Sequence, residues 1–444
     1  MTRLGSHRWG RSMGAKVVVL GGGIAGIQAA LDLGDMGFEV HLVERTPSIG
    51  GHMAQLDKTF PTNDCSMCIL SPKMIMCADH QNIILHTYSE LERVEGEFPN
   101  FKVTIREKAR YVDVSRCTGC GDCVAKCPVK VPSEFEEGLI ERKAIYMPFP
   151  QSVPRKVTID ATKCRMITQK KCGVCKKVCK AGAIDYDQKD RSIVIDASAI
   201  VVSTGFAVMD VSVLPQFGYG ICKDVVTSIQ FERILCASGP TGGHLRRPSD
   251  GAEPKSLAFI QCVGSRDART HAYCSSVCCM YATKESILAG EHCPGIKSTI
   301  FYMDMRAVGK GFQEFVQRAQ RSYGVRYINS RPAKIQPGED GKGALVSYER
   351  RGAGGEPVTE PFDMVVLCPA LEPKSNAQLA VLLGIEMDAD GFFRSPDPAH
   401  PADSTRKGIF ACGFSNAPMD IPDTVTQASS AAARVAELIF GGGY

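Results

Sequence analysis

The sequence has little net charge and no long apolar run. Its 52 lysines and arginines nearly balance 48 aspartates and glutamates, leaving a formal charge of +4. A chain without a broad positive field is not expected to bind nucleic acid. Charges or glycine clusters interrupt each apolar stretch before it reaches the length of a membrane span, about 20 residues. These absences exclude nucleic-acid-binding and membrane-spanning proteins from the expected classes.

The N-terminal residues resemble a signal peptide only in part. Arg3, Arg8 and Arg11 precede an apolar stretch, as they would in an exported protein. That stretch contains a cluster of glycines and lacks a small-residue cleavage site, so we do not expect export. We expect a cytoplasmic protein in which residues 1–12 form a flexible leader.

The 20 cysteines are concentrated in two regions of the chain. Eight lie between Cys117 and Cys179, mostly at C-x-x-C spacing, and four lie between Cys262 and Cys279. Disulfide scaffolds of this density are short and secreted, unlike this chain of 444 residues. Clustered cysteines in a long chain indicate metal ligation, so the sequence predicts a redox protein with several metal clusters.

A strand, a glycine turn and a helix form the first structural pattern. A β-branched run at 16–20 leads into GGGIAGIQAALDLGDMG, and a second strand at 38–43 ends at Glu44. In a G-x-G-x-x-G loop, the first glycine permits the turn, the second lets a pyrophosphate approach, and the third lets helix and strand pack. These positions are Gly21, Gly23 and Gly26. With Glu44 placed to bind a ribose, the pattern predicts a dinucleotide site.

The remaining pattern predicts an α/β domain in several parts, an insert and a second α/β unit. Strand patterns at 92–113 and from 192 enclose a segment at 114–185 that is rich in Cys, Lys and Pro, which indicates an inserted module. A Pro/Gly-rich stretch at 240–255 predicts an interdomain linker. The expected divisions are 1–12 (leader), 13–110, 191–254 and 373–444 (one domain in three parts), 111–190 (insert) and 255–372 (second domain).

The second α/β unit lacks the glycine loop that would bind NAD(P)H. After a strand at 256–262 the sequence reads CVGSRDARTHAYCSSVCCMYATKE, with four cysteines where a pyrophosphate would dock. We expect a helix over 275–289, whose N-terminus favours an anion such as a thiolate-ligated cubane. Cys274 and Cys278, four residues apart, are expected on one helical face. The predicted ligands are Cys262, Cys274, Cys278 and Cys279. Buried structural cysteines are the alternative.

The insert carries the cysteine run of a ferredoxin. CTGCGDCVAKCP at 117–128 is the C-x2-C-x2-C-x3-C-P pattern of bacterial ferredoxins, whereas the partner run CGVCKKVC follows a more distant Cys164. Zinc ligands and free thiols are the alternatives. The resemblance implies two clusters, one held by Cys117, Cys120, Cys123 and Cys179 and the other by Cys127, Cys164, Cys172 and Cys175. The longer spacing after Cys164 leaves the role of that residue open.

Three segments resemble the thioredoxin-reductase and glutathione-reductase flavoproteins. They are ERTPSIGG from Glu44, IVVSTG at 200–205 and GIFACG at 408–413. The resemblance implies FAD binding in a Rossmann fold of that kind. It assigns cofactor contacts to Arg45, Gly50, Gly51, Thr204, Gly205 and Gly413. The third segment departs from the pattern, because Phe414 replaces the usual acid.

Longer segments resemble the HdrA family, the flavoprotein component of heterodisulfide reductases. These are TNDCSMCILSPKM at 62–74, CVGSRDAR…YCSSVCCMYATKE from Cys262, and DIPDTVTQASSAAARVA at 420–436. The resemblance implies an iron–sulfur flavoprotein in which the four cysteines from Cys262 to Cys279 hold a [4Fe–4S] cluster near the flavin. We expect a short form, without the N-terminal cluster domain and C-terminal ferredoxin domain of long members.

Four weaker signals concern small groups of residues. Cys65 and Cys68 form a C-x-x-C that predicts a redox dithiol or extra cluster ligands, together with Cys77, or else a packed thiol pair. Lys284 extends towards the flavin or is a solvated helix lysine. The final helix, over about 424–440, is expected to begin at Asp423 or Thr424 and to direct its N-terminus at the flavin. The segment 163–180 contains seven lysines and arginines and no aspartate or glutamate, which predicts either a docking surface for a partner or a solvated face. They are Lys163, Arg165, Lys170, Lys171, Lys176, Lys177 and Lys180.

Together these features predict an oxidoreductase component for electron transfer. FAD would exchange electron pairs and three [4Fe–4S] clusters would carry single electrons. The resemblance adds electron bifurcation or confurcation, partners among other heterodisulfide-reductase-like subunits, a hydrogenase or a ferredoxin, and a homodimer within a larger complex. One alternative is a self-contained NAD(P)H-dependent disulfide reductase using Cys65 and Cys68, which the missing second glycine loop disfavours. Another is a non-catalytic electron-relay scaffold.

Overall fold

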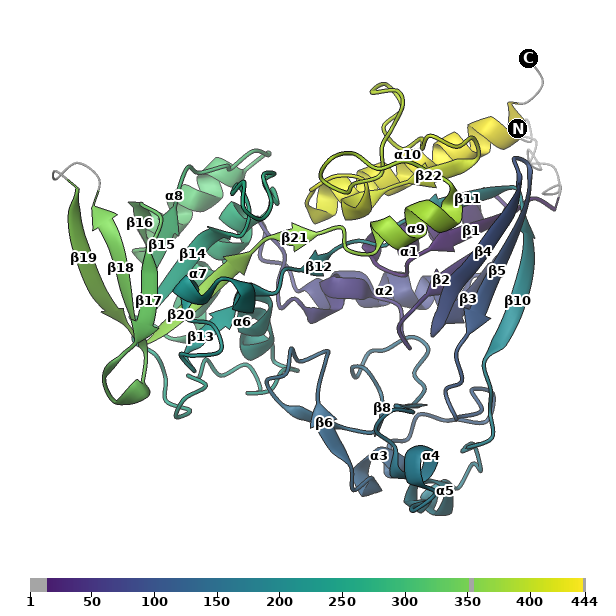
Figure 1. The fold of residues 1–444 in the computed structure, drawn as a ribbon, viewed down its shortest axis with the longest axis horizontal. Coiled ribbons are helices and arrows are strands. Elements are labelled where there is room, and N and C mark those ends of the chain that lie inside the picture. Colours follow the sequence, from purple (N-terminus) through teal and green to yellow (C-terminus); the bar gives the residue numbers. More distant parts are fainter. Residues whose placement is uncertain (1–13, 351–354, 442–444) are drawn as a thin grey trace, which may run out of the picture.

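The computed structural model describes residues 14–350 and 355–441, so the expected leader at 1–12 lies outside the described residues. Two α/β domains lie to the left and right in Figure 1, and a small module lies below them. Within the described ranges, none of the helices combines the length and apolarity that crossing a membrane requires.

The first domain is built on a five-stranded parallel sheet in the order β22-β11-β1-β2-β3. Its strands are β1 (Lys16–Leu20), β2 (Glu39–Glu44), β3 (Ile83–Thr87), β11 (Ala199–Val202) and β22 (Ile409–Ala411). Val17 and Val19 belong to the core formed with helices α1 (Ile24–Asp35) and α10 (Ile421–Phe440). Val18 and Leu20 belong to the core on the opposite face. Both faces of β1 are therefore buried, which explains its continuous apolar sequence.

A three-stranded antiparallel sheet covers that opposite face, in the order β10-β5-β4. Its strands are β4 (Ser89–Glu97), β5 (Asn100–Glu107) and β10 (Arg191–Ala197). Phe101, Val103 and Ile105 alternate inward along β5 and are fully buried. The predicted strands around 92–113 are therefore these two, β4 and β5, and their period-two pattern faces the core of the first domain.

The second domain also contains a five-stranded parallel sheet, in the order β13-β20-β14-β15-β16. The strands are β13 (Val225–Thr227), β14 (Ser256–Val263), β15 (Lys297–Tyr302), β16 (Arg326–Asn329) and β20 (Met364–Pro369). The helices that share its core are α6 (Ser228–Leu235), α7 (Cys278–His292) and α8 (Phe312–Tyr323). An antiparallel sheet of β17 (Lys334–Pro337), β18 (Ala344–Arg350) and β19 (Glu356–Phe362) contributes to the core of the other face.

The second domain begins earlier than the sequence predicts. We expected residues 191–254 to belong to the first domain, but β13 pairs with β20 in the second sheet. Phe217 and Cys222 are buried in the same core. The prediction was wrong because a three-residue strand carries too little periodicity to show which sheet it joins.

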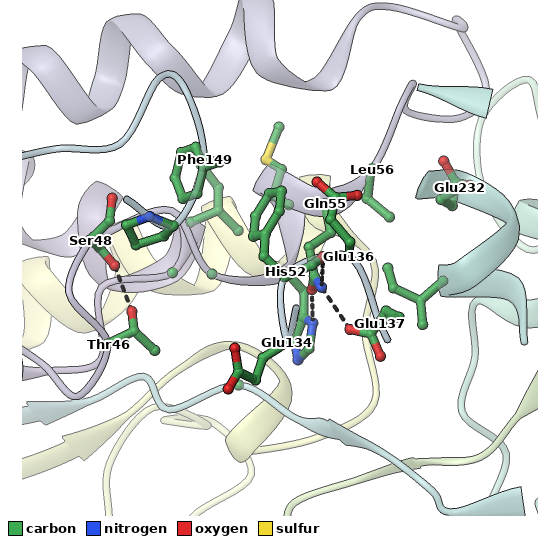
Figure 2. Close-up of a pocket in the computed structure, with 18 of the residues that line it drawn as sticks. Thr46, Ser48, His52, Gln55, Leu56, Glu134, Glu136, Glu137, Phe149 and Glu232 are labelled. Carbon is green, nitrogen blue, oxygen red and sulfur yellow. Dashed lines mark hydrogen bonds between the residues drawn. The ribbon is translucent and has the colours of Figure 1, made fainter. Parts of the chain in front are cut away.

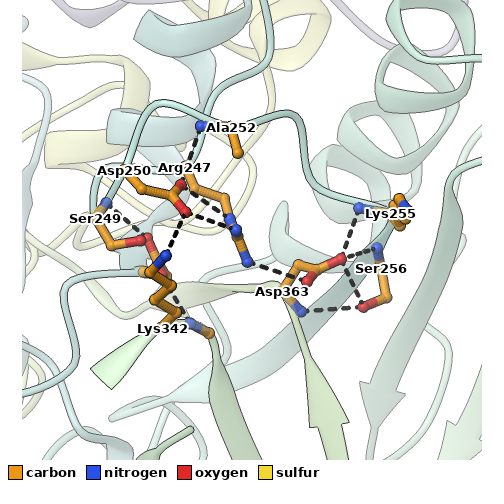
Figure 3. Close-up of polar contacts among 10 residues, drawn as sticks. Arg247, Ser249, Asp250, Ala252, Lys255, Ser256, Lys342 and Asp363 are labelled. Carbon is orange, nitrogen blue, oxygen red and sulfur yellow. Dashed lines mark hydrogen bonds and ion pairs between the residues drawn. The ribbon is translucent and has the colours of Figure 1, made fainter. Parts of the chain in front are cut away.

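The stretch at 240–255 is likewise attached to the second domain. Figure 3 shows Arg247 between Asp250 and Asp363, with nitrogen–oxygen distances of 2.8 and 3.1 Å. Asp363 also accepts hydrogen bonds from the backbone N–H groups of Lys255 and Ser256, at 2.7 and 3.1 Å. These contacts tie the stretch to the start of β14, so it is not a free linker.

The inserted module has a small core that combines four of its thiols with aliphatic side chains. Cys117, Cys123, Cys164 and Cys175 are buried together with a few aliphatic residues such as Ile159. Its elements are α3 (Asp122–Lys126), β6 (Lys130–Pro132), β7 (Glu141–Lys143), β8 (Ile145–Tyr146), β9 (Thr158–Ile159), α4 (Arg165–Gln169) and α5 (Val174–Val178). Helices this short have little intrinsic stability.

The remaining elements carry weak sequence signals. They are α2 (Ser66–Asp79), α9 (Asn376–Leu383), the two-stranded β12 (Ala207–Val208) with β21 (Leu371–Glu372), and short 3-10 turns η1 (Gly51–Gln55), η2 (Val211–Val213), η3 (Pro215–Phe217), η4 (Glu339–Gly341) and η5 (Gly413–Ser415). Helix α2 continues through an internal Pro72, which disfavours a helix in any reading from sequence alone.

Candidate functional site

A cavity of about 1210 Å³ lies where the two domains and the module meet. Figure 2 shows its wall built from all three: His52 comes from the first domain, Glu232 from the second, and Glu134, Glu137 and Phe149 from the module. A cavity of this size, lined by the glycine loop at one end, has room for a dinucleotide.

The glycine loop has the geometry that its pattern predicts. Gly21 has φ of +106°, a conformation that L side chains rarely adopt. A Cβ added to Gly26 would lie 1.8 Å from the carbonyl oxygen of Gly21, so this position needs glycine for helix and strand to pack. A Cβ on Gly23 would have no neighbour within 4 Å, and Gly23 lines the cavity. The N-terminus of α1 is therefore open to an anionic ligand.

Glu44 is held in place at the cavity wall by backbone groups. Its carboxylate accepts hydrogen bonds from the N–H groups of Gly22 and Thr46, both at 2.7 Å. Arg45 also lines the cavity, and its guanidinium donates to Ser375 Oγ at 3.3 Å. Both positions agree with contacts to the adenosine half of a dinucleotide.

The two glycines that follow β2, Gly50 and Gly51, have different roles. Gly51 lines the cavity, and a Cβ there would lie 2.9 Å from the Cα of Gly23. Gly50, with φ of +128°, does not line it and instead shapes the turn. The expected cofactor contact therefore falls on Gly51 rather than Gly50.

The second and third segments that resemble the flavoproteins, at 200–205 and 408–413, contribute differently to the cavity wall. Thr204 and Gly205 line the cavity, and Thr204 Oγ1 is buried without a protein hydrogen-bond partner, as expected of a ligand contact. Gly413 does not line the cavity; its N–H donates to Gln427 Oε1 at 2.8 Å and supports α10. Phe414 lines the cavity in its place.

Helix α10 does direct its N-terminus at the cavity, but it begins before the predicted residues. Its N-cap is Asp420, whose side chain accepts the N–H of Asp423 at 2.9 Å. Asp420, Pro422 and Thr424 line the cavity, whereas Asp423 does not. The prediction that Asp423 or Thr424 caps this helix was wrong, because Pro422 fits the first helical turn and Asp420 can cap it from outside.

Lys284 is buried at the cavity wall, so the alternative of a solvated lysine is wrong. Its side chain is 1% exposed, forms an ion pair with Glu232, and donates to the carbonyl oxygen of Lys58 at 2.8 Å. Burial and the adjacent Glu232 raise the pKa of Glu285 well above its ordinary value. The sequence offered no signal for Glu232 or Glu285.

The second group of cysteines gathers at the start of α7. Cys262, Cys278 and Cys279 are at most 4% exposed. Hydrogen bonds from Cys278 lower the pKa values of Cys262 and Cys279, so the three thiols are in contact. Cys274 lies in the preceding loop, because α7 begins at Cys278 and not at 275. The prediction that Cys274 and Cys278 share a helical face was therefore wrong.

The structure brings together one of the two cysteine groups that the ferredoxin pattern implies. A small cavity is lined by Cys127, Cys164, Cys172 and Cys175. The extra residues after Cys164 form helix α4, which leaves Cys164 at this cavity.

Cys123 lies close to thiols of both groups. Burial and the thiols of Cys175, Cys117, Cys120 and Cys179 raise the pKa of Cys123 to about 12. In the described part of the chain no three His, Cys, Asp or Glu side chains are arranged for a single metal ion. A cubane requires a wider arrangement, because it binds each thiolate at a different iron.

Cys65 and Cys68 form a disulfide at the N-terminus of α2. Neither residue lines the cavity. Cys77 is buried near the far end of the same helix, where its thiol donates to the carbonyl oxygen of Ile27 at 3.6 Å. The expectation that Cys77 joins the pair as a ligand was wrong, because twelve residues of helix separate Cys77 from Cys65, about 1.5 Å each.

Two family models match the chain. Residues 16–66 match a model described as FAD dependent oxidoreductase, and residues 110–133 match one described as a 4Fe-4S binding domain. The fold resembles thioredoxin reductase from Lactococcus lactis, with a TM-score of 0.53 at 16% identity, covering 96% of this chain and 99% of that one. The enzyme from T. acidophilum is similar at a TM-score of 0.53 and 14% identity, covering 97% and 100%. The predicted thioredoxin-reductase-like fold is confirmed.

Curated relatives match almost the whole chain. The chain is 48% identical over 421 residues to the iron–sulfur A subunit of the CoB–CoM heterodisulfide reductase of Methanocaldococcus jannaschii, covering 94% of this chain and 63% of that protein. It is 50% identical over 430 residues to one of the iron–sulfur A subunits of this reductase in Methanopyrus kandleri, covering 96% and 65%. The chain thus spans just under two thirds of these relatives. Over that span, this chain belongs to the HdrA family of heterodisulfide reductase flavoproteins.

Proposed function

We propose that this chain is an FAD- and [4Fe–4S]-containing oxidoreductase subunit of a heterodisulfide-reductase-like complex. One observation carries the proposal: the first turn of α7 holds Cys278 and Cys279, while Tyr281 and Lys284 of the same helix line the cavity. A flavin in the cavity and a cluster at the cysteines would then be adjacent. When bound, FAD exchanges two-electron for one-electron chemistry, and the clusters carry single electrons.

The protein groups around the cavity favour negative charge on a bound ring system. Lys284 supplies a buried positive charge, and the N-terminus of α10 supplies a partial one. Burial and Glu232 raise the pKa of Glu285, which favours its neutral form beside Lys284. These residues would stabilise an anionic reduced flavin without a solvent-exposed counter-ion.

The wider role is also part of the proposal. It includes electron bifurcation or confurcation, a cytoplasmic location, and assembly with other heterodisulfide-reductase-like subunits, a hydrogenase or a ferredoxin. A related protein of Methanothermobacter marburgensis, 46% identical over 428 residues, is named as the A subunit of an H2:CoB–CoM heterodisulfide,ferredoxin reductase. A homodimer within the larger complex is proposed from the family resemblance alone.

Cofactor content tests the proposal. Anaerobically purified protein should contain one FAD and about twelve irons, four for each of three clusters. The variant Cys278→Ser should retain FAD and lose about four irons, since only the site on α7 is altered. Zinc in place of iron, or about eight irons in the unmodified chain, would contradict the third cluster.

A disulfide reductase that uses Cys65 and Cys68 is the second candidate, because these residues form a disulfide. Their absence from the cavity wall disfavours it. Rapid bleaching of the flavin by NADH without a partner protein, together with disulfide turnover that Cys65→Ser abolishes, would favour this candidate instead.

The seven lysines and arginines between Lys163 and Lys180 are proposed to bind an acidic redox partner. All seven are exposed, and none has an ion-pair partner among the described residues. Helices α4 and α5, which carry several of them, lie at the end of the module furthest from the two domains (Figure 1). Their positive charge would increase the association rate with a negatively charged partner.

Neutralising four of these cations should slow electron transfer to the native partner at low salt. The variant changes Lys170, Lys171, Lys176 and Lys177 to Gln. We expect a loss of about tenfold or more in association rate at low ionic strength and little loss at high salt, where screening removes the steering. The control changes the same number of exposed lysines elsewhere, namely Lys102, Lys297, Lys310 and Lys334. Equal rates for both variants at low salt would leave this face without a docking role.

A further inference from the structure

His52 lies on the cavity wall with an oxygen atom against each nitrogen of its ring. It belongs to the turn η1, directly after the glycine pair at 50–51. Its Nδ1 is 2.7 Å from Gln55 Oε1, and its Nε2 is 3.0 Å from the carbonyl oxygen of Phe206. The imidazole also stacks on the ring of Phe206, with the centroids 4.5 Å apart. These contacts hold the imidazole in a single orientation.

The orientation of the Gln55 amide decides which group donates to which. Its Nε2 donates to the carbonyl oxygen of Phe135 at 3.0 Å and to Glu137 Oε1 at 2.7 Å (Figure 2 shows the contacts with His52 and Glu137). A backbone carbonyl only accepts, so exchanging the amide nitrogen and oxygen would set two acceptors against each other at Phe135. Gln55 is 6% exposed, so such a clash would be costly. The oxygen of the amide therefore faces His52.

Both partners of the imidazole are thus acceptors. The carbonyl oxygen of Phe206 and the amide oxygen of Gln55 have no hydrogen to donate. A neutral imidazole has one N–H group and one nitrogen lone pair, so it would direct the lone pair at one of these oxygens. A hydrogen on each nitrogen satisfies both contacts and gives the ring a positive charge. This holds whatever the charge of Glu137, because Phe135 alone fixes the amide.

We propose that His52 is doubly protonated and places a second positive charge on the cavity wall, which stabilises the anionic reduced form of the bound flavin. The inference rests on the proposed FAD site. Lys284 supplies the other charge from the second domain, whereas His52 belongs to the first domain. A charge on the wall of a partly enclosed cavity is screened less than one in water, so it acts on a ligand without touching the reacting atoms. Gln55 is the positioning residue of this arrangement.

NMR of protein with isotope-labelled histidine nitrogens counts the hydrogens directly. The signals of His52 are identified as those missing from His52→Gln. In the anaerobically purified, FAD- and iron-loaded protein at neutral pH, we expect one-bond nitrogen–hydrogen coupling at both ring nitrogens of His52. A ring nitrogen without a hydrogen would overturn the proposal, and this measurement is made on the unmodified site.

A redox titration of the flavin absorbance measures what the charge does. In His52→Gln, which removes the charge and keeps a polar side chain, the ratio of reduced to oxidised flavin should fall about tenfold at the midpoint of the unmodified protein. This equals a shift of about 30 mV to lower potential for a two-electron couple. His52→Lys, which keeps a positive charge without the flat ring, should shift less.

His292→Gln is the matched control. The Nδ1 of His292 also lies against a backbone carbonyl oxygen, that of Gly243 at 2.7 Å, but this residue is exposed and does not line the cavity. We expect His292→Gln to keep the midpoint of the unmodified protein. If His52→Gln also keeps it, the role of His52 is overturned and the flavin site stands. Unmodified protein purified without FAD would contradict the flavin site itself and the stabilising role with it.

Discussion

Replacing Arg233 by alanine should lower the free energy of unfolding by about 3–5 kcal/mol, because it leaves the largely buried carboxylate of Glu136 unpaired. The Arg233 side chain is 1% exposed. Its guanidinium donates to both oxygens of Glu136, at 2.9 and 3.1 Å, and to the carbonyl oxygen of Gln55 at 3.1 Å. It also lies over the ring of Phe135, 4.8 Å from the centroid. This one residue joins the second domain, the first domain and the module.

The thermal unfolding midpoint of the iron-loaded protein measures this effect. Arg93→Ala is the control, since Arg93 is 65% exposed and pairs with an exposed Glu95, so its loss should cost under about 1 kcal/mol. The double change of Arg233 and Glu136 to Met should recover much of the lost stability, because it leaves no unpaired charge. A midpoint for Arg233→Ala equal to that of Arg93→Ala would contradict the structural role assigned to this pair.

Two glycine substitutions in the first loop should separate folding from cofactor binding. Gly26→Ala should destabilise the protein by about 3 kcal/mol and abolish FAD retention, because its Cβ would overlap the backbone of Gly21 at 1.8 Å. Gly23→Ala meets no protein atom within 4 Å and should leave the stability of the apoprotein unchanged. Its methyl group nevertheless occupies the place where a pyrophosphate approaches, so FAD retention should fall.

The measurements are the flavin-to-protein ratio after purification and the unfolding midpoint after flavin removal. Normal flavin content in Gly23→Ala would show that the cofactor does not approach this loop closely. A wild-type midpoint in Gly26→Ala would show that helix α1 and β1 can separate, contrary to the contact described.

Motifs formed by residues close together in the chain could be interpreted from sequence. The glycine loop, Glu44 and the ferredoxin run each depend on spacings within about thirty residues, which one β-α-β unit or one short loop sets by itself. Their geometry in the structure follows the pattern: Gly21 has a positive φ, Gly26 cannot bear a Cβ, and Cys164 reaches the same small cavity as Cys172. Local chain geometry was sufficient for these features.

Features that join distant segments required the tertiary structure. Nothing in the local pattern shows that β13 pairs with β20, that Arg233 binds Glu136, or that Lys284 is buried against Glu232. The cap of α10 was misplaced for a related reason, since Asp420 and Asp423 are both good caps and only the packed helix selects one.

The sequence alone was enough to predict the cofactor classes and the cysteine sets, because those predictions depend on residue type and short spacing. The tertiary structure decided which of these residues share a cavity. Helix α7 links the cysteine site to the cavity through Tyr281 and Lys284, while the disulfide of Cys65 and Cys68 lies off the cavity wall. The physical reason is that burial and charge pairing depend on contacts between segments far apart in the chain, which no periodicity records.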